Sequence, residues 1–255
     1  MDKLDKMAAA VDIAAKEAQA ISQLSIGTSF SIEDAYEIQK RAIKRRIDRG
    51  ENLIGLKMGF TSEAKMIQMG VHDMIWGRLT DSMLIENGGE LSLGNFIHPR
   101  AEPEVCFRIS KDIEGEIPLK DLDEYVDGIA AAIEIIDSRF ENFKFSLEDV
   151  VADNCSSSAL VIGKWQKPSR DIGDLKMTQS FNNEMVAEGS SADILGDPWK
   201  SLQAATRLAE QYGEPIKEGH VIMAGAATAA VFLKPDSDVQ ADVERLGSVR
   251  IQVIN

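Results

Sequence analysis

Cysteine and long apolar runs are what this sequence most lacks. Its 255 residues contain two cysteines, Cys106 and Cys155, without the spacing of a metal motif. That count argues against a disulfide-stapled secreted scaffold and favours a reducing compartment. No apolar run reaches the ~18–20 residues of a membrane-spanning helix, and residues 1–20 lack the uninterrupted apolar core of a signal peptide. We therefore expect a soluble cytoplasmic protein.

Positive charge and histidine are also scarce. Lysine and arginine number 28 against 42 aspartates and glutamates, and the formal net charge is −14. Nucleic acids and anionic membranes are bound by clustered cations, so neither is expected as a partner. The three histidines, His72, His98 and His220, lack metal-binding spacing, and we interpret them as structural. A site for an anionic substrate has to supply its own positive charge.

Several common catalytic motifs are missing as well. The sequence has no G-x-S-x-G elbow, H-E-x-x-H zinc motif, Walker phosphate loop or G-x-G-x-x-G fingerprint. Their absence argues against serine hydrolases, zinc proteases, nucleotide-binding proteins and dehydrogenases.

Helical patterns dominate the first 50 residues. Residues 2–20 have helical apolar spacing, and Ser31 with Asp34 forms a capping-box variant that begins a second helix, which ends at Gly50. The chain is long enough to bury a core without a structural metal. We predict a helical N-terminal part over 1–50 and a β-rich core over 51–255, as two units or as one single domain.

Short apolar runs separated by turns follow from residue 53. Residues 129–136, 158–163, 220–224, 229–233 and 248–254 have strand patterns. Asp197 and Pro198 begin one further helix, which runs to Gly213. Many short strands with few helices predict an α+β fold.

Paired carboxylates are the sharpest chemical feature of the chain. Glu102 and Glu104 flank Pro103, and residues two apart on a strand share a face. Proline at this place indicates an edge strand or a bulge. Glu134 lies in an apolar strand, where a charge needs a partner. Three converging carboxylates would suit Mg²⁺ or Mn²⁺.

Purely structural roles are the alternative for these carboxylates and for the other polar candidates. A Glu-x-Glu pair is often simply solvated, and Glu134 has Arg139 or Arg100 as a possible ion-pair partner. Lys57, between two glycines, either holds a substrate carboxylate or extends to water. Asp81 is either a general acid/base or a turn residue, and the polar stretch 153–158 either binds ligand oxygens or forms a plain loop.

Taken in order, a series of motifs resembles the fumarylacetoacetate hydrolase superfamily. The resemblance covers residues 30–250 and favours the branch of 2-oxopent-4-enoate hydratases and 4-oxalocrotonate decarboxylases. The motifs are GLKMGFTSEAKMIQMGV, WGRLTDSM, HPRAEPEVCF, EIIDSRFENFKF, VVADNCSSS, AGAATAAV and LGSV.

This resemblance implies a fold, a metal and an assembly. The family has a β-rich core with a peripheral helical part, a Mg²⁺ or Mn²⁺ site, and homo-oligomers. Carried over by position, Glu102, Glu104 and Glu134 are the metal ligands, and Lys57 and Ser156 bind substrate. Asp81 is then a candidate for proton transfer.

Three features place the chain nearer to the decarboxylases within that branch. They are the stretch IDSRFENFKF, the residues of 228–231, and an acidic residue at Asp81 where hydratases have one at the position of Ser82. The expected reaction is decarboxylation of 2-oxohex-3-enedioate to 2-hydroxypenta-2,4-dienoate. A dianionic substrate needs further donors, for which Arg139 is a candidate.

Other functions stay open at this point. The first alternative is a 2-hydroxypenta-2,4-dienoate hydratase. The second is a non-catalytic subunit of a complex with a related hydratase, although such a subunit would not need the three glutamates and Lys57. A C–C bond hydrolase of the same superfamily is a third, but its usual His–Glu pair is not found by motif.

Overall fold

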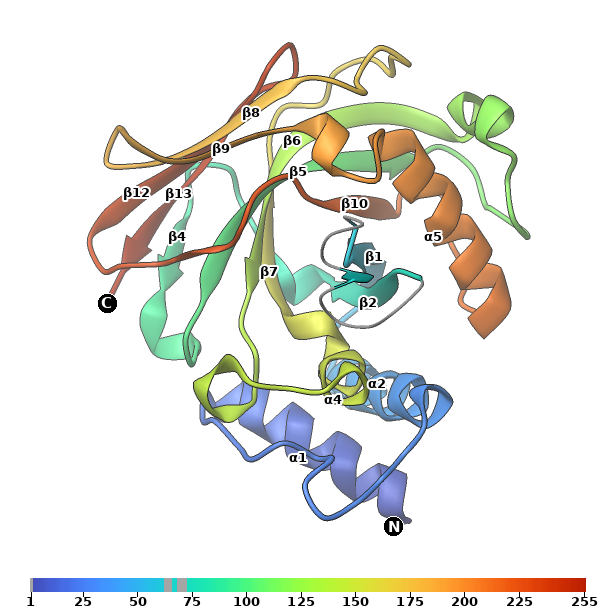
Figure 1. Ribbon diagram of the computed structural model, residues 1–255, viewed down its shortest axis with the longest axis vertical. Coiled ribbons are helices and arrows are strands. Elements are labelled where there is room, and N and C mark those ends of the chain that lie inside the picture. The colour runs from blue at the N-terminus through green and yellow to red at the C-terminus, as the bar shows by residue number, and fades with distance from the viewer. Residues whose placement is uncertain (1, 62–65, 68–72) are drawn as a thin grey trace.

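The computed structural model describes residues 2–61, 66–67 and 73–255 (Figure 1). Residues 62–65 and 68–71 of the GLKMGFTSEAKMIQMGV motif and His72 lie outside the described residues. The chain folds into two β-sheets with helices gathered mainly at one end, so the predicted α+β class with a β-rich core is confirmed.

The N-terminal helices form as the apolar spacing of residues 2–20 and the capping box at Ser31 predict. Helix α1 spans Lys3–Glu17, and α2 spans Ile32–Ile47 behind the capping box of Ser31 and Asp34. A short helix from the core, α4 (Leu147–Ala152), packs on α2. The buried Gln39 of α2 donates its Nε2 hydrogens to the carbonyl oxygens of Trp76 (3.1 Å) and Val151 (2.8 Å). The helices are thus bonded to the core, and a domain division at residue 50 stays a prediction.

The larger sheet has eight strands and carries the site. Its order is β2-β1-β10-β5-β6-β7-β3, and β11 pairs with one end of β5. The strands are β1 (Leu53–Gly59), β2 (Ile75–Thr80), β3 (Leu84–Ile85), β5 (Arg100–Ile109), β6 (Val126–Ile136), β7 (Ser157–Ile162), β10 (Val221–Ala226) and β11 (Val231–Phe232).

The smaller sheet covers one face of the larger one. It has the order β4-β13-β12-β8-β9, with β4 (Glu90–Ser92), β8 (Lys176–Phe181), β9 (Glu184–Ser190), β12 (Ser237–Val243) and β13 (Gly247–Ile254). Strands β12 and β13 contact β5 and β6, and the core between the sheets is apolar. Helix α5 (Pro198–Tyr212) packs on β10, begins at the Asp197 cap and ends at the left-handed Gly213, as predicted.

Pro103 lies in a central strand and not at an edge, so that part of the prediction is wrong. Strand β5 is flanked by β10 and β6, but β10 is irregular between Met223 and Ala226, and its last register pair with β5 is Ala226 with Glu104, one residue before the level of Pro103. The Pro103 carbonyl accepts a hydrogen bond from the Ala227 amide at 3.2 Å. The N–H and C=O of one residue point to the same side of an antiparallel strand. The missing N–H therefore faces the bulge, and the ladder to β6 is intact.

Candidate active site

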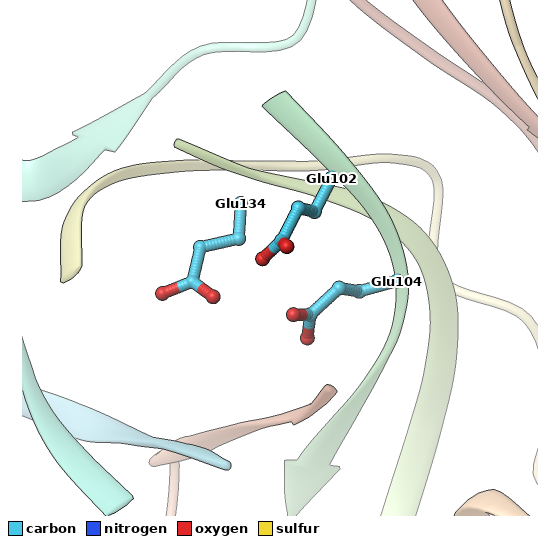
Figure 2. Close-up of side chains that lie close together, drawn as sticks. All are labelled: Glu102, Glu104 and Glu134. Carbon is cyan, nitrogen blue, oxygen red and sulfur yellow. The ribbon is translucent and has the colours of Figure 1, made fainter. Parts of the chain in front are cut away.

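Adjacent strands bring the three predicted glutamates together. Glu102 and Glu104 project from one face of β5, and the strand register places Glu134 of β6 directly opposite Glu102. Figure 2 shows the three carboxylates turned toward one another. One oxygen from each lies within 4.8 Å of the other two. Residue spacing alone does not show whether the three carboxylates meet, and in the fold they do.

Two of the three carboxylates in this cluster are fully buried, and the third, Glu102, is half-buried. Glu104 and Glu134 are both 0% exposed. Burial, followed by the nearby Glu134 carboxylate, raises the pKa of Glu104 well above its ordinary value. The Gly225 amide donates a hydrogen bond to Glu104 Oε2 at 2.8 Å, whereas Glu104 Oε1 and Glu134 Oε1 have no hydrogen-bond partner. Like charges at these distances repel, so the cluster is stabilised by a cation or a proton among the carboxylates.

Lys57 supplies one positive charge at this cluster. Its Nζ lies 2.9 Å from Glu134 Oε2, an ion-pair distance without hydrogen-bond alignment, and it donates to the Cys155 carbonyl at 3.2 Å. Burial alone would lower the pKa of Lys57, but Glu134 and the other nearby acidic groups outweigh it and raise that pKa. Lys57 is therefore a cation at neutral pH and does not extend to bulk water.

A left-handed turn places Ser156 beside Lys57. Asn154, Cys155 and Ser156 all have positive φ angles, of 50°, 52° and 60°. Such a run is costly for residues other than glycine and persists only where its surroundings hold it. The Ser156 hydroxyl is buried without a hydrogen-bond partner, and the residue lines the site cavity. The Ser156 hydroxyl is thus available to a bound ligand, and its role in substrate binding stays a prediction.

These groups open into a cavity of about 880 Å³. Its wall contains Lys57, Glu102 and Ser156 together with Arg100 and Phe143. A volume in this range suits a small organic ligand. No histidine is among the described residues of the wall, so a His–Glu pair for hydrolysis is not found in this part of the chain.

Arg139 is not among the described residues of the cavity wall, so the geometry gives its predicted role in substrate binding no support. Its guanidinium is buried against Asp153, to which it donates from Nε, and it also donates to the Ser157 carbonyl and the Ser158 hydroxyl. It does not pair with Glu134 either. Despite the nearby guanidinium, burial raises the pKa of Asp153 to about 6. Arg139 therefore fixes the loop that carries Ser156.

Asp81 is also remote from the described cavity wall, so the geometry does not support a proton-transfer role. It begins the 3-10 turn Asp81–Met83, it is exposed, and its carboxylate accepts hydrogen bonds from Asn52 N (3.0 Å) and Nδ2 (2.8 Å). The side-chain and backbone donors of Asn52 lower the pKa of Asp81. This arrangement is the turn that the sequence analysis kept as the alternative.

The donor set fits a hard divalent cation. It offers three carboxylates, and buried oxygens of Glu104 and Glu134 are left without hydrogen-bond donors. Buried unpaired oxygens of this kind are unfavourable unless a cation or proton lies among them. All-oxygen ligands are the preference of Mg²⁺ and Mn²⁺, not of soft metals.

Comparison with known families identifies the family of this chain. The family model for the C-terminal domain of fumarylacetoacetate (FAA) hydrolase matches residues 59–254. The chain belongs to the fumarylacetoacetate hydrolase family. All three glutamates lie within the matched region, whereas Lys57 lies just before it.

Individual relatives within the family are close and nearly full in length. A 4-oxalocrotonate decarboxylase of Pseudomonas sp. is 50% identical over 97% of this chain and 96% of its own. A 2-hydroxyhexa-2,4-dienoate hydratase of Comamonas testosteroni is 32% identical over 88% of this chain and 86% of its own. The structure of 4-oxalocrotonate decarboxylase from Pseudomonas putida G7, complexed with magnesium and adipate, matches with a TM-score of 0.94 and 34% identity. It covers 99% of this chain and 97% of that one.

Sequence reasoning missed two contributors to the site. The first is Gly225, whose amide donates to Glu104 Oε2. This glycine has a φ of +104°, and a Cβ at its position would lie 2.3 Å from Thr61 Oγ1. The sequence pattern indicates Arg100 only as a possible partner for Glu134, yet Arg100 lines the cavity. Its place two residues before Glu102 was the signal, because alternate residues of a strand share a face.

Proposed function

We propose that this chain catalyses the metal-dependent decarboxylation of 2-oxohex-3-enedioate (4-oxalocrotonate) to 2-hydroxypenta-2,4-dienoate. The observation that carries the proposal is the buried Glu102–Glu104–Glu134 cluster beside Lys57, in a chain 50% identical to a 4-oxalocrotonate decarboxylase. The proposed metal ligands are these three glutamates, and the proposed cofactor is Mg²⁺ or Mn²⁺.

The chemistry requires an electron sink at the 2-oxo group. The C5–C6 bond breaks, C6 leaves as CO₂, and the electron pair moves through the alkene onto the C2 oxygen, which then takes up a proton. A divalent cation held by the three glutamates would supply the positive charge that stabilises this oxygen. Three carboxylates carry −3, and a divalent cation with Lys57 restores near neutrality before substrate binds.

This chain's own residues bind and orient the substrate. Lys57, fixed between Glu134 and the Cys155 carbonyl, is placed to pair with the C1 carboxylate or the C2 oxygen. The unpartnered Ser156 hydroxyl is a further donor on the same wall. The fully buried floor of the cluster excludes water and strengthens these charge interactions.

Hydration of 2-hydroxypenta-2,4-dienoate is the second candidate function. The relative from Comamonas testosteroni supports it, since a dienoate hydratase is 32% identical over most of the chain. Addition of water needs a positioned general acid/base, which decarboxylation does not. With Asp81 bonded to Asn52 at the surface, decarboxylation is the simpler fit.

A paired ultraviolet assay tests the two functions. One sample contains 2-oxohex-3-enedioate, the other 2-hydroxypenta-2,4-dienoate, each with Mg²⁺ and with EDTA as control. Metal-dependent CO₂ release from the diacid, with the dienol stable, is expected. Loss of the dienol without CO₂ from the diacid would instead establish a hydratase. Inactivity on both would favour a non-catalytic subunit.

The setting of the enzyme is part of the same proposal. We propose a cytoplasmic homo-oligomer that can form a complex with a related hydratase, which would consume the dienol product. Both cysteines are free and buried, in keeping with a reducing compartment. Within the described residues, none of the helices has the length and apolarity to cross a membrane. Size-exclusion chromatography with light scattering measures the assembly.

A further inference from the structure

Arg100 extends the row of functional side chains along β5. Arg100, Glu102 and Glu104 occupy alternate positions, so all three project from the same face of the strand. At about 3.4 Å per residue, Arg100 lies about 7 Å along the strand from Glu102. Lys57 lies toward the other end, since its register partner Met223 pairs with Cys106. Two cations therefore flank the carboxylate cluster on the same sheet.

Two phenylalanines hold the Arg100 guanidinium. Its Cζ lies 4.0 Å from the ring centre of Phe143 and 4.1 Å from that of Phe232. Phe232 is the cross-strand neighbour of Arg100 in β11, and Phe143 comes from the 3-10 turn Glu141–Phe143. Stacking uses the flat faces of the guanidinium and leaves its in-plane N–H groups for an anion.

The positive charge of Arg100 is not matched by an ion pair. Among the residues that the structure describes, Arg100 has no salt-bridge partner, and its buried Nε has no hydrogen-bond acceptor. Glu102 is the neighbouring carboxylate that acts on it electrostatically, and Glu102 is a proposed metal ligand. A cation at the glutamates would therefore leave Arg100 without a counter-charge. An unpaired half-buried arginine on a cavity wall is a site for an anionic group.

We propose that Arg100, clamped by Phe143 and Phe232, binds the distal carboxylate of the substrate and makes the site selective for dicarboxylates over monocarboxylates. This inference rests on the proposed function, in which the 2-oxo acid end lies at the glutamates and Lys57. The separation of Arg100 from Glu102 along the strand matches the length of a six-carbon diacid. The same cavity wall also contains Lys144, but that side chain is exposed and its charge is already hydrated.

The reaction gives this contact a kinetic signature. The distal carboxylate loses its charge as it leaves as CO₂, so its pairing with Arg100 is stronger in the ground state than in the transition state. An interaction of this kind lowers KM without raising kcat. Arg100→Met is therefore expected to raise KM while kcat stays the same or increases. Damage to the fold or to the metal site would lower kcat instead.

Calorimetric titration of the Mg²⁺-loaded protein tests the proposal without turnover. The ligands are adipate, which has two carboxylates, and hexanoate, which has the same chain length and one. Arg100→Met is expected to weaken adipate binding by about ten- to a hundredfold, the range for a hydrogen-bonded charge pair, and to leave hexanoate unchanged. Arg100→Lys, which keeps the charge but loses the flat stacking fork, is expected to lie between.

Two control variants complete the design. Arg108→Met removes an arginine on the same strand that pairs with Asp127 at 2.6 Å and stacks on Trp165, outside the described cavity wall. It is expected to have no effect on either ligand. Lys144→Met is expected to have a small effect. Equal weakening of adipate and hexanoate by Arg100→Met, wild-type adipate binding in that variant, or a larger loss from Lys144→Met would overturn the proposal.

The binding data separate this inference from the proposed function. If the wild type does not decarboxylate the diacid but prefers adipate to hexanoate through Arg100, the proposed reaction fails and the dicarboxylate site stands. If the diacid is decarboxylated and Arg100→Met changes neither KM nor adipate binding, the reaction stands and the assignment of Arg100 fails.

Discussion

Replacing Glu104 with glutamine should make the metal-free protein more stable while weakening metal binding. Glu104 is fully buried, accepts the Gly225 amide at Oε2, and has no partner at Oε1. A glutamine keeps an oxygen for that amide and turns an NH₂ group toward the other two carboxylates. It therefore removes a repulsion and adds donors, at the cost of an anionic metal ligand.

The size of this effect follows from the geometry. Two unit charges 4.8 Å apart repel by about 3.5 kcal/mol at an effective dielectric constant of about 20. Partial compensation by Lys57 and partial protonation reduce the expected gain to about 1–2 kcal/mol, or about 2–8 °C in Tm for a chain of this size.

The gain in stability of Glu104→Gln over the wild type should increase as pH rises. The pKa of Glu104 is raised above its ordinary value of 4.5 by burial and by Glu134. The folded state therefore binds this proton more tightly than the unfolded state, and the free energy of unfolding of the wild type falls as pH rises above about 4.5. The variant cannot titrate at this position, so its advantage should grow from pH 5 to pH 8.

Thermal unfolding in EDTA and in Mg²⁺, with calorimetric Mg²⁺ titration, measures both halves of this prediction. Glu188→Gln, on the exposed strand β9, is the matched control and should change neither quantity. Mg²⁺ should stabilise the wild type by about 2.7 kcal/mol at a hundredfold excess over Kd, and Glu104→Gln much less. A lower Tm for Glu104→Gln in EDTA at pH 8, or wild-type Mg²⁺ affinity, would refute the reasoning.

Three further substitutions test other parts of the structure. Gly225→Ala should destabilise the protein by about 2–4 kcal/mol, because the backbone has a left-handed φ and the added Cβ would clash with Thr61. Urea unfolding measures this loss. Stability equal to that of the wild type would contradict the close approach of Thr61 to Gly225. Lys57→Met should lower kcat at least about a hundredfold, because it removes a buried cation from the site. It should leave Mg²⁺ binding intact, because the lost group is a cation paired with Glu134 and not a metal ligand. Steady-state kinetics and calorimetric Mg²⁺ titration measure the two effects. Asp12→Asn should cost about 1–2 kcal/mol at pH 7, because two arginines of the second helix and the turn after it hydrogen-bond to this carboxylate. Burial of Asp12 opposes these hydrogen bonds, but together the two arginines lower the pKa of Asp12 below 3.8. The stability advantage of the wild type over Asp12→Asn should therefore disappear as pH falls below about 4, as urea titrations measure. An advantage that persists at pH 3 would exclude this cause.

Local chemistry explains which parts of the fold could be predicted from the sequence. The helix beginning after Ser31 and the helix between Asp197 and Gly213 follow from caps within a few residues, and both are confirmed. The shared face of Glu102 and Glu104 follows from strand geometry in the same way. These features depend on contacts close in sequence, which a single chain displays directly.

Features that depend on register between distant segments could not be derived in this way. Glu134 joins the cluster because β6 pairs with β5 in one particular register, across some thirty residues. Spacing does not decide whether Arg139 or Arg100 faces the cavity. In the structure Arg100 lines the described wall, and Asp153 engages Arg139. The family resemblance supplied the glutamates and Lys57, but it did not supply these arginine partners.

The residues at the two ends of the cavity are carried by different kinds of backbone. Lys57 and Glu102 stand on long strands in the middle of a sheet, whereas Phe143 stands on a single turn, and Phe232, which stacks on Arg100 behind the wall, stands on a two-residue strand. Mutations at the peripheral side alter the far end of the pocket without changing the strand register that assembles the charges. Evolution or laboratory selection can therefore exchange substrates here by rebuilding a few peripheral residues, with the reaction centre inherited unchanged.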